Sequence, residues 1–336
     1  MTESTSKSHT KSDKAAKPSP LYAPLGWILK GVALLPFGIL YALGDLLWFI
    51  AYRVVGYRRK VVAKNLSESF PDRTPEELRK IEHEFYHNLA DEFVETVKLG
   101  HVTDREMKTR MEFEGVEIID RLISEGRSLC VYFSHCFNWE WAPAVTLWSR
   151  YGDSADVEFS QVYRPLRNMW FDRWYLRLRS RFGSVSYPKK TVLRDLLMIK
   201  RSGKQSVTGF MSDQKPSHGD PTYVTTFLNH PTAMITGTET LARKLGMGAV
   251  YWDMHKLSRG HYRIVVRLMS DDASQTAPME LTAMYTRMLQ ESIEREPSLW
   301  LWTHKRWKIP VTLPSASDNI TLTPLPAHKH TPELLS

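Results

Sequence analysis

The sequence predicts an α/β fold, with a largely parallel central sheet flanked by helices and an N-terminal membrane helix. Two patterns predict it. In the last two thirds of the chain, short apolar strand patterns alternate with longer helical patterns, and this alternation is typical of parallel sheets. Near the start, an apolar stretch between Lys30 and Arg53 carries a single charge, at Asp45. A chain of 336 residues can bury a large core.

The apolar stretch is long enough to cross a bilayer, which takes roughly 20 apolar residues. Pro36 and Asp45 interrupt it, so a tilted or half-inserted helix and a buried core helix are alternatives. We predict a membrane-anchoring helix at 21–55 and an α/β domain at 56–308. The segments 1–20 and 309–336 have little to bury, and we expect disordered tails there.

The helices and strands of the α/β domain follow in order. Thr74, Pro75 and Glu77 form a capping pattern that begins a long helix, and Gly100 ends it. Expected strands lie at Ser128–Phe133, Val157–Tyr163, Gln205–Met211, Ala249–Met254 and Tyr262–Leu268. Expected helices lie at Trp139–Arg150, Met169–Phe182, Thr191–Arg201, Thr236–Leu245 and Pro278–Arg295.

The positive charge of the chain is clustered. Lys and Arg number 45 against 37 Asp and Glu, which gives +8. Basic runs at 53–64 and 164–190 favour an anionic partner such as lipid headgroups, a phosphorylated substrate, an acidic carrier protein or nucleic acid; a solvated surface is the alternative. Cys130 and Cys136 are too few for a disulfide framework, which favours a reducing, cytoplasmic compartment.

The candidate catalytic residues are His135 and Glu140. His135 directly follows a predicted strand, where parallel sheets form their ligand crevice. Across a strand–loop–helix turn, Glu140 could hydrogen-bond one ring nitrogen of His135 and leave the other free to take a hydroxyl proton. A hydroxyl activated in this way can attack a thioester. The bare His-x4-Glu pattern also occurs by chance.

Three further residues are candidates for substrate binding. Arg164 follows a strand, and its guanidinium suits a phosphate or an oxyanion. Asp213 also ends a strand; it would orient substrate, pair with Arg164 or serve only as a turn residue. Asn138 could donate to the oxyanion, although we favour a cap on the helix that begins at Trp139.

Two other clusters have competing interpretations. His83 and His87 match the H-E-x-x-H zinc pattern, but they lie on a long amphipathic helix without an evident third ligand. We predict no metal and no cofactor. An aromatic–basic cluster near the C-terminus would either dock on anionic headgroups or pack against the core. It comprises Trp300, Trp302, His304, Lys305, Arg306, Trp307 and Lys308.

The chain resembles the lipid A biosynthesis acyltransferases, the Kdo-dependent lauroyl and myristoyl transferases of Gram-negative bacteria, over roughly residues 20–308. The motifs that carry the resemblance are Tyr57-Arg58-Arg59, Asn65-Leu66, Phe70-Pro71, Glu114-Gly115, His135 with Glu140, Tyr163-Arg164-Pro165, Asp213-Gln214, and Trp302-Thr303-His304-Lys305-Arg306-Trp307-Lys308. Gln214, which replaces a more usual His, is a further substrate-binding candidate. Phe227-Leu228-Asn229-His230 stands where Phe-Phe-Gly is more common, and both departures concern acceptor and chain length more than reaction type.

The resemblance implies a bacterial inner-membrane enzyme with its catalytic domain on the cytoplasmic face. It implies acyl transfer from acyl carrier protein, or acyl-CoA, to a hydroxyl of an anionic glycolipid, the lipid A precursor, without a nucleic-acid partner. A lysophospholipid or other glycolipid acceptor is the main alternative. A metallopeptidase using His83 and His87 and a nucleic-acid-binding membrane tether are alternatives from other classes.

Overall fold

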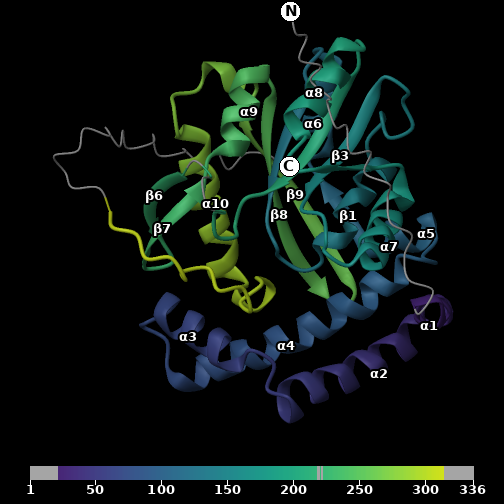
Figure 1. Ribbon diagram of the computed structural model, residues 1–336, viewed down its shortest axis with the longest axis vertical. Coiled ribbons are helices and arrows are strands. Elements are labelled where there is room, and N and C mark those ends of the chain that lie inside the picture. Colours follow the sequence, from purple (N-terminus) through teal and green to yellow (C-terminus); the bar gives the residue numbers. More distant parts are fainter. Residues whose placement is uncertain (1–21, 218–219, 221, 314–336) are drawn as a thin grey trace, which may run out of the picture.

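The computed structural model describes residues 22–217, 220 and 222–313, and it contains a seven-stranded sheet in the order β1-β9-β8-β2-β5-β3-β4. Every neighbouring pair is parallel except β8 with β9. Helices α9 and α10 cover one face of the sheet, and α6 and α7 lie on the other (Figure 1). The α/β fold with a largely parallel sheet is therefore confirmed.

The strands of the large sheet are β1 (Met111–Glu114), β2 (Leu129–Phe133), β3 (Val157–Tyr163), β4 (Val185–Pro188), β5 (Gln205–Met211), β8 (Gly248–Ser258) and β9 (His261–Ser270). The helices around it are α5 (Asp104–Arg110), α6 (Val116–Ser124), α7 (Met169–Arg179), α8 (Val192–Arg201), α9 (Gly237–Leu245) and α10 (Glu280–Arg295). All five expected strands are present. The sequence patterns missed β1 and β4, because four-residue strands are too short to show a period.

One expected helix takes a different form. The segment Trp139–Leu147 is a 3-10 helix, with Pro143 inside it, rather than an α-helix that reaches Arg150. Proline has no backbone N–H and its ring crowds the preceding turn, so a continuous α-helix is disfavoured there. The result is a tighter segment directly after His135.

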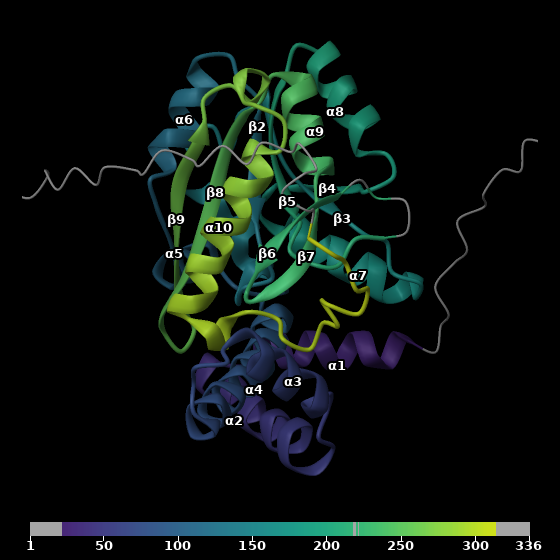
Figure 2. The same cartoon turned by 90° about the vertical axis from the view of Figure 1, so that its left-hand side faces the viewer.

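A separate antiparallel hairpin, β6 (Thr222–Phe227) and β7 (His230–Ile235), packs beside α10 (Figure 2). Its two-residue turn consists of Leu228 and Asn229, both with positive φ, at 49° and 64°. Hairpin turns of this kind favour Asn, which tolerates the left-handed conformation. The unusual sequence at 227–230 is thus a local turn of the hairpin.

Four helices form a layer below the sheet (Figures 1 and 2). They are α1 (Ala23–Leu34), α2 (Phe37–Trp48), α3 (Arg59–Ser69) and α4 (Pro75–Lys98), and a π-helical segment at Phe49–Val54 continues α2. Helix α4 begins with the expected capping box, in which Thr74 and Glu77 exchange hydrogen bonds. It lies between α2 and the sheet domain (Figure 1).

The single anchoring helix expected at 21–55 is instead two helices. Leu35 is extended, with φ −63° and ψ 144°, because the residue before a proline avoids helical geometry. By length and composition alone, Phe37–Val54 is apolar enough to cross a membrane. In the structure this segment lies along α4: Tyr41 donates to Glu95, and Asp45 pairs with Arg259.

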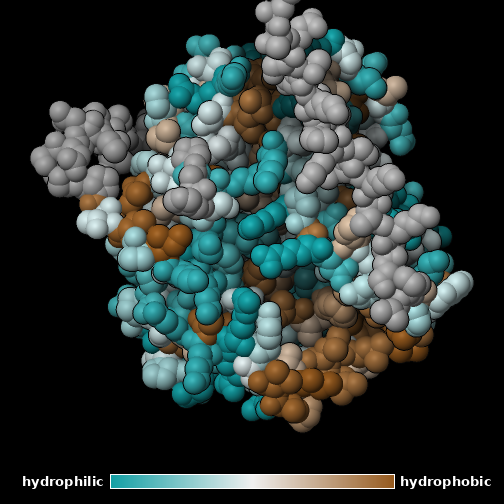
Figure 3. Space-filling model, viewed as in Figure 1, coloured by the Kyte–Doolittle hydropathy of each residue, from teal (hydrophilic) through white to brown (hydrophobic). Residues whose placement is uncertain are grey.

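The outer side of these two helices is strongly apolar, and it forms the continuous hydrophobic area at the lower right of Figure 3. We call it the apolar ridge. Its most exposed members are Trp27, Ile28, Leu34, Ile39, Leu46, Phe49, Ile50, Val54 and Val55. Contiguous exposed apolar surface of this kind usually marks a contact with a membrane or a partner. The expected tails at 1–20 and 309–336 lie outside the described residues, except 309–313, which contain no helix or strand.

Candidate active site

His135 and Asp213 lie side by side because β2 and β5 are neighbouring parallel strands. In the register of this pair, Phe133 lies opposite Met211, so the residues two positions beyond each strand end also meet. The Nδ1 atom of His135 is 2.8 Å from Asp213 Oδ1, and the backbone N–H of His135 donates to Oδ2 at 3.0 Å. The expected position of His135 at the crevice of the sheet is confirmed.

Asp213 is a buried carboxylate with several donors. Trp300 Nε1 donates to its Oδ2 at 2.8 Å, beside the two bonds from His135. Burial by itself raises the pKa of Asp213, but the charge of His135 and the hydrogen bonds from His135 and Trp300 outweigh it. The net effect lowers the pKa to about 2, so Asp213 is ionised at neutral pH.

This carboxylate determines which nitrogen of His135 is basic. A carboxylate only accepts hydrogen bonds, so the neutral ring carries its proton on Nδ1 and exposes a lone pair on Nε2. Gln214 Nε2 lies 3.1 Å from His135 Nε2 and acts as the donor in this arrangement. Gln214 therefore occupies the space next to the lone pair of His135 Nε2, on the cavity side of the ring.

The hydrogen bond expected between Glu140 and His135 is absent. Both carboxyl oxygens of Glu140 accept from Arg179, at 2.7 and 2.6 Å, and Oε1 also accepts from Trp139 Nε1 at 3.1 Å. A fork-like, charge-assisted pair with arginine is stronger than a bond to a neutral imidazole. Glu140 is thus correctly placed beside the cavity, but Asp213 takes the orienting position that the sequence pattern assigned to Glu140.

Asn138 is fully buried and faces away from the cavity. It precedes the 3-10 helix at Trp139, yet its side chain forms no cap, so the preferred interpretation as a helix cap was wrong. Its Nδ2 donates to Glu95 Oε2 at 2.8 Å. Asn138 is not among the residues that line the cavity, so the expected oxyanion contact is not formed either.

Glu95 is a second buried carboxyl, directly behind the site. It also accepts hydrogen bonds from Tyr41 and Tyr262, which fixes helix α4 to both α2 and β9. Burial and the charge of Asp91 raise the pKa of Glu95 to about 7, against the hydrogen bonds from Asn138 and the two tyrosines. This group therefore titrates near neutral pH.

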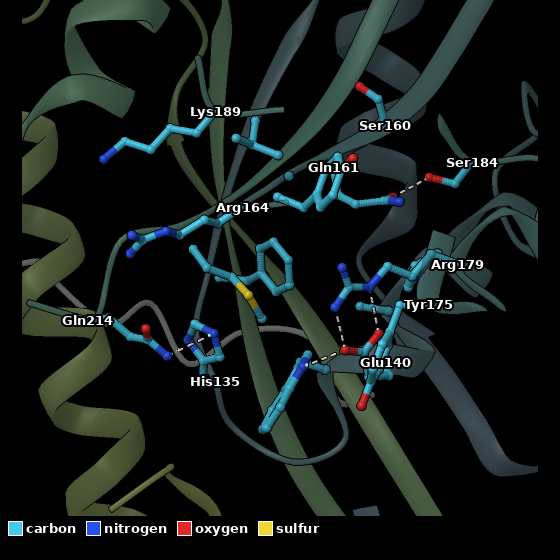
Figure 4. Close-up of a pocket in the computed structure, with 18 of the residues that line it drawn as sticks. His135, Glu140, Ser160, Gln161, Arg164, Tyr175, Arg179, Ser184, Lys189 and Gln214 are labelled. Atoms are coloured by element: carbon cyan, nitrogen blue, oxygen red, sulfur yellow. Dashed lines mark hydrogen bonds and ion pairs between the residues drawn. The ribbon is translucent and has the colours of Figure 1, made fainter. Parts of the chain in front are cut away.

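The site opens into a cavity of about 620 Å³, which is within the usual range for ligand pockets. His135, Glu140, Arg164 and Gln214 all line it (Figure 4). Its inner walls are largely apolar and come from the core, including Val145, Phe159, Val207 and Trp252. Buried polar side chains, Ser160, Gln161 and Ser184, also line it, away from His135 (Figure 4), so the lining combines apolar and polar groups.

Arg164 is exposed at the rim of this cavity, on the same side as Lys189 (Figure 4). Within the described residues it forms no ion pair with Asp213, so that expected pairing is wrong. Lys189 is held by Asp220 at 2.7 Å. The guanidinium of Arg164 is thus available at the entrance, where an anionic group of a ligand would pass.

Three of the seven residues of the C-terminal aromatic–basic cluster are buried in the core. Trp300 and Trp302 are 2% and 0% exposed, and Arg306 is 3% exposed. The core-packing interpretation is thus confirmed for these three residues, and headgroup docking by them was wrong. Trp300 is nevertheless a functional candidate through its bond to Asp213. The aromatic–basic pattern pointed to this segment, and the basic run 164–190 contains Arg179, but neither pattern indicated the bond of Trp300 to Asp213 or that of Arg179 to Glu140.

The zinc interpretation gains no support from the geometry. His83 and His87 pack against the ring of Trp48, with centroids 4.9 and 4.1 Å from it. Among the residues that the structure describes, no group of three or more His, Cys, Asp or Glu is placed to hold a metal ion.

Comparisons with known proteins give one consistent answer. The model of the bacterial lipid A biosynthesis acyltransferase family matches residues 17–309. The lipid A biosynthesis lauroyltransferase of Escherichia coli K12 is 27% identical over 282 residues, which cover 82% of this chain and 88% of that protein. The lipid A biosynthesis palmitoleoyltransferase of the same organism is 23% identical over 275 residues, 82% and 86% of the two chains. The chain therefore belongs to the bacterial lipid A biosynthesis acyltransferases.

Proposed function

We propose that this enzyme transfers a fatty acyl chain from a thioester donor to a hydroxyl of a lipid A precursor, with His135 as the general base and Asp213 as the group that orients it. The observation that carries this proposal is the bond between His135 Nδ1 and the buried Asp213 carboxylate, which leaves Nε2 basic at the cavity. Family membership supports the reaction type.

In this mechanism the acceptor hydroxyl displaces the Gln214 amide and donates its hydrogen bond to His135 Nε2. As Nε2 takes the proton, the oxygen attacks the thioester carbonyl and forms a tetrahedral intermediate. Asp213 stabilises the resulting imidazolium. Collapse of the intermediate breaks the carbon–sulfur bond, and the departing thiolate takes the proton from His135. The products are the ester and the free thiol.

The apolar and polar side chains of the cavity suit different parts of the substrates. The acyl chain lies among the apolar side chains of the inner wall, where its transfer from water is favourable. Arg164 at the rim contacts an anionic group, either a phosphate of the glycolipid or one on the donor. Acyl carrier protein is the proposed donor and acyl-CoA the alternative, and both carry a phosphopantetheine thioester.

We further propose that the apolar ridge lies in the bacterial inner membrane, with the catalytic domain on its cytoplasmic face. The polar contacts of α2 with α4 and Arg259 favour helices in the plane of the interface over an isolated span. An enzyme seated in this way receives a lipid acceptor directly from the bilayer.

A transfer assay tests the reaction. It contains purified full-length protein, a lipid A precursor and acyl carrier protein that carries a radiolabelled acyl chain. Wild-type enzyme should form the acylated lipid, and His135→Ala should reduce kcat by about 10²–10⁴-fold, the usual contribution of a positioned acid–base group. Undiminished transfer by His135→Ala would contradict the mechanism. Lipid mass spectrometry of a deletion strain distinguishes the alternative acceptors. Lipid A that lacks one acyl chain would support the proposal, and unchanged lipid A would refute it.

A further inference from the structure

The side chain of Gln214 covers the basic nitrogen of His135. Its Nε2 donates to His135 Nε2 at 3.1 Å, while its amide oxygen points away from the ring (Figure 4). The ring of Trp139 lies against the same imidazole, with the two centroids 5.2 Å apart. The lone pair that would accept a hydroxyl proton is therefore occupied by a side chain of the protein itself.

The backbone on both sides of Gln214 is held in place. The carboxylate of Asp213 accepts a hydrogen bond from Trp300 Nε1 at 2.8 Å, and the backbone N–H of Lys215 donates to His304 Nε2 at 3.2 Å. The Gln214 side chain, in contrast, is half-buried and lines the cavity. A rotation of this side chain can therefore uncover the base without any movement of the backbone.

Water is the competing nucleophile for a base at this position. The side chain of His135 is 19% exposed and lines the cavity, so solvent can reach the ring. A water molecule that donates to Nε2 is activated as a hydroxyl group is. Its oxygen attacks the thioester carbonyl while Nε2 takes one proton, the carbon–sulfur bond then breaks, and the departing thiolate takes that proton back. The products are a free fatty acid and the thiol, so the acyl chain is lost.

A lipid acceptor and a water molecule differ in what they gain when they displace the amide. Each must replace the hydrogen bond from Gln214, and one net hydrogen bond changes an equilibrium by about fivefold to tenfold. The acceptor contacts the protein through many other groups, and the binding energy of these contacts can offset the displacement. Water only exchanges one hydrogen bond for another. The amide therefore disfavours water more than it disfavours the acceptor.

We propose that Gln214 is a specificity-determining residue that favours acyl transfer over hydrolysis: its amide covers His135 Nε2 until the hydroxyl of a bound lipid acceptor displaces it. The inference rests on the proposed function for the role of His135 as the base and for the thioester donor. Because an amide does not titrate, Gln214 can donate this hydrogen bond across the whole working pH range.

Hydrolysis of the donor without an acceptor tests the proposal. Full-length protein is given acyl carrier protein that carries a radiolabelled acyl chain, and the free fatty acid is measured. Gln214→Ala should release fatty acid about fivefold to tenfold faster than wild type. Gln214→Asn, whose amide is one methylene too short to reach Nε2, should do the same if the alanine variant does not fold. The exposed Gln275, outside the cavity, provides the matched control Gln275→Ala, which should hydrolyse the donor like wild type.

The same variants are then assayed with a lipid A precursor present. For Gln214→Ala, the ratio of hydrolysis to transfer should rise by about fivefold to tenfold. Unchanged hydrolysis in both Gln214 variants would overturn the proposal. A parallel loss of hydrolysis and transfer would also overturn it, because that result would mean that the amide donates to the oxyanion of the tetrahedral intermediate.

Modification of His135 by diethyl pyrocarbonate tests the cover separately from the reaction. This reagent attacks the lone pair of a neutral imidazole, and mass spectrometry of the peptide that contains His135 measures the rate. Gln214→Ala should be modified about fivefold to tenfold faster than wild type, and equal rates would overturn the proposal. Faster modification of the variant, together with no acyl transfer to a lipid A precursor by wild type, would contradict the proposed function but support Gln214 as the cover of the base.

Discussion

The ring of His135 is bound to the carboxylate of Asp213 at 2.8 Å, although 78 residues separate them in the chain. Nearby in sequence, Glu140 is bound to Arg179 instead. The structure thus assigns the two carboxylates different surroundings: one orients the histidine, and the other forms an ion pair in the cavity wall. Variants of the two carboxylates should have different effects.

Replacing Asp213 with Asn should reduce kcat by about 10²–10⁴-fold. The amide no longer stabilises the imidazolium and can hold the ring in either tautomer, as loss of an orienting carboxylate does in other histidine-based enzymes. Steady-state transfer kinetics measure this. Asp271→Asn is a matched control, because Asp271 is exposed on the surface and pairs with Arg121. Near-normal turnover by Asp213→Asn would exclude an orienting role.

Replacing Glu140 with Gln should cost more in the free energy of unfolding than in the activation free energy that sets kcat. The change leaves Arg179, whose side chain is 22% exposed, without its counter-charge. Breaking a buried ion pair costs about 3–5 kcal/mol, and partial exposure reduces this to about 2–4 kcal/mol here. Denaturant unfolding measures the loss. The double variant Glu140→Leu, Arg179→Met should recover most of it; no recovery would mean that the pair is not the source.

Glu95 makes the stability of the fold depend on pH. Its pKa is raised from 4.5 in the unfolded chain to about 7 in the folded protein, so folding favours the protonated form. This contribution is fully present below pH about 4.5 and is lost as pH rises through about 7. A shift of this size corresponds to about 3 kcal/mol. Unfolding free energies measured between pH 4 and 8 should show the decline, and Glu95→Gln should flatten it. An identical pH profile in the variant would contradict the assignment.

The apolar ridge should be required for membrane binding. Ile39 and Leu46, 50% and 54% exposed, lie seven residues apart on one side of α2. Removing two such side chains from lipid costs about 1.5–3 kcal/mol each, so Ile39→Glu with Leu46→Glu should weaken vesicle binding by about a hundredfold or more. Flotation with phospholipid vesicles measures it. Met198→Glu, on α8 and 59% exposed, is the control and should float like wild type.

Sequence patterns were reliable for elements whose signal is local. Val157–Tyr163 and Gln205–Met211 were predicted with the bounds that the structure has, because strand patterns and flanking turn residues lie within a few positions of each other. The capping box at Thr74 and the position of His135 after a strand are local for the same reason. Four-residue strands are too short for periodicity to define. Pro36 was recognised as an interruption, although one helix was predicted across it.

Contacts between distant segments were beyond the sequence patterns. Asp213 was recognised as a residue at the end of a strand, but strand order decides that β5 lies next to β2, and register decides that Asp213 meets His135. Glu140 is closer to His135 in the chain than Asp213 is, but the side chain of Arg179, on α7, binds Glu140.

The sequence by itself therefore determined the fold class, the family and the histidine at the end of β2, since periodicity and short motifs encode these. Only the tertiary structure decided which carboxylate lies against His135 and where Asn138 points. The physical reason is that hydrogen-bond partners are chosen by proximity and strength in three dimensions, which strand order, register and helix packing determine together.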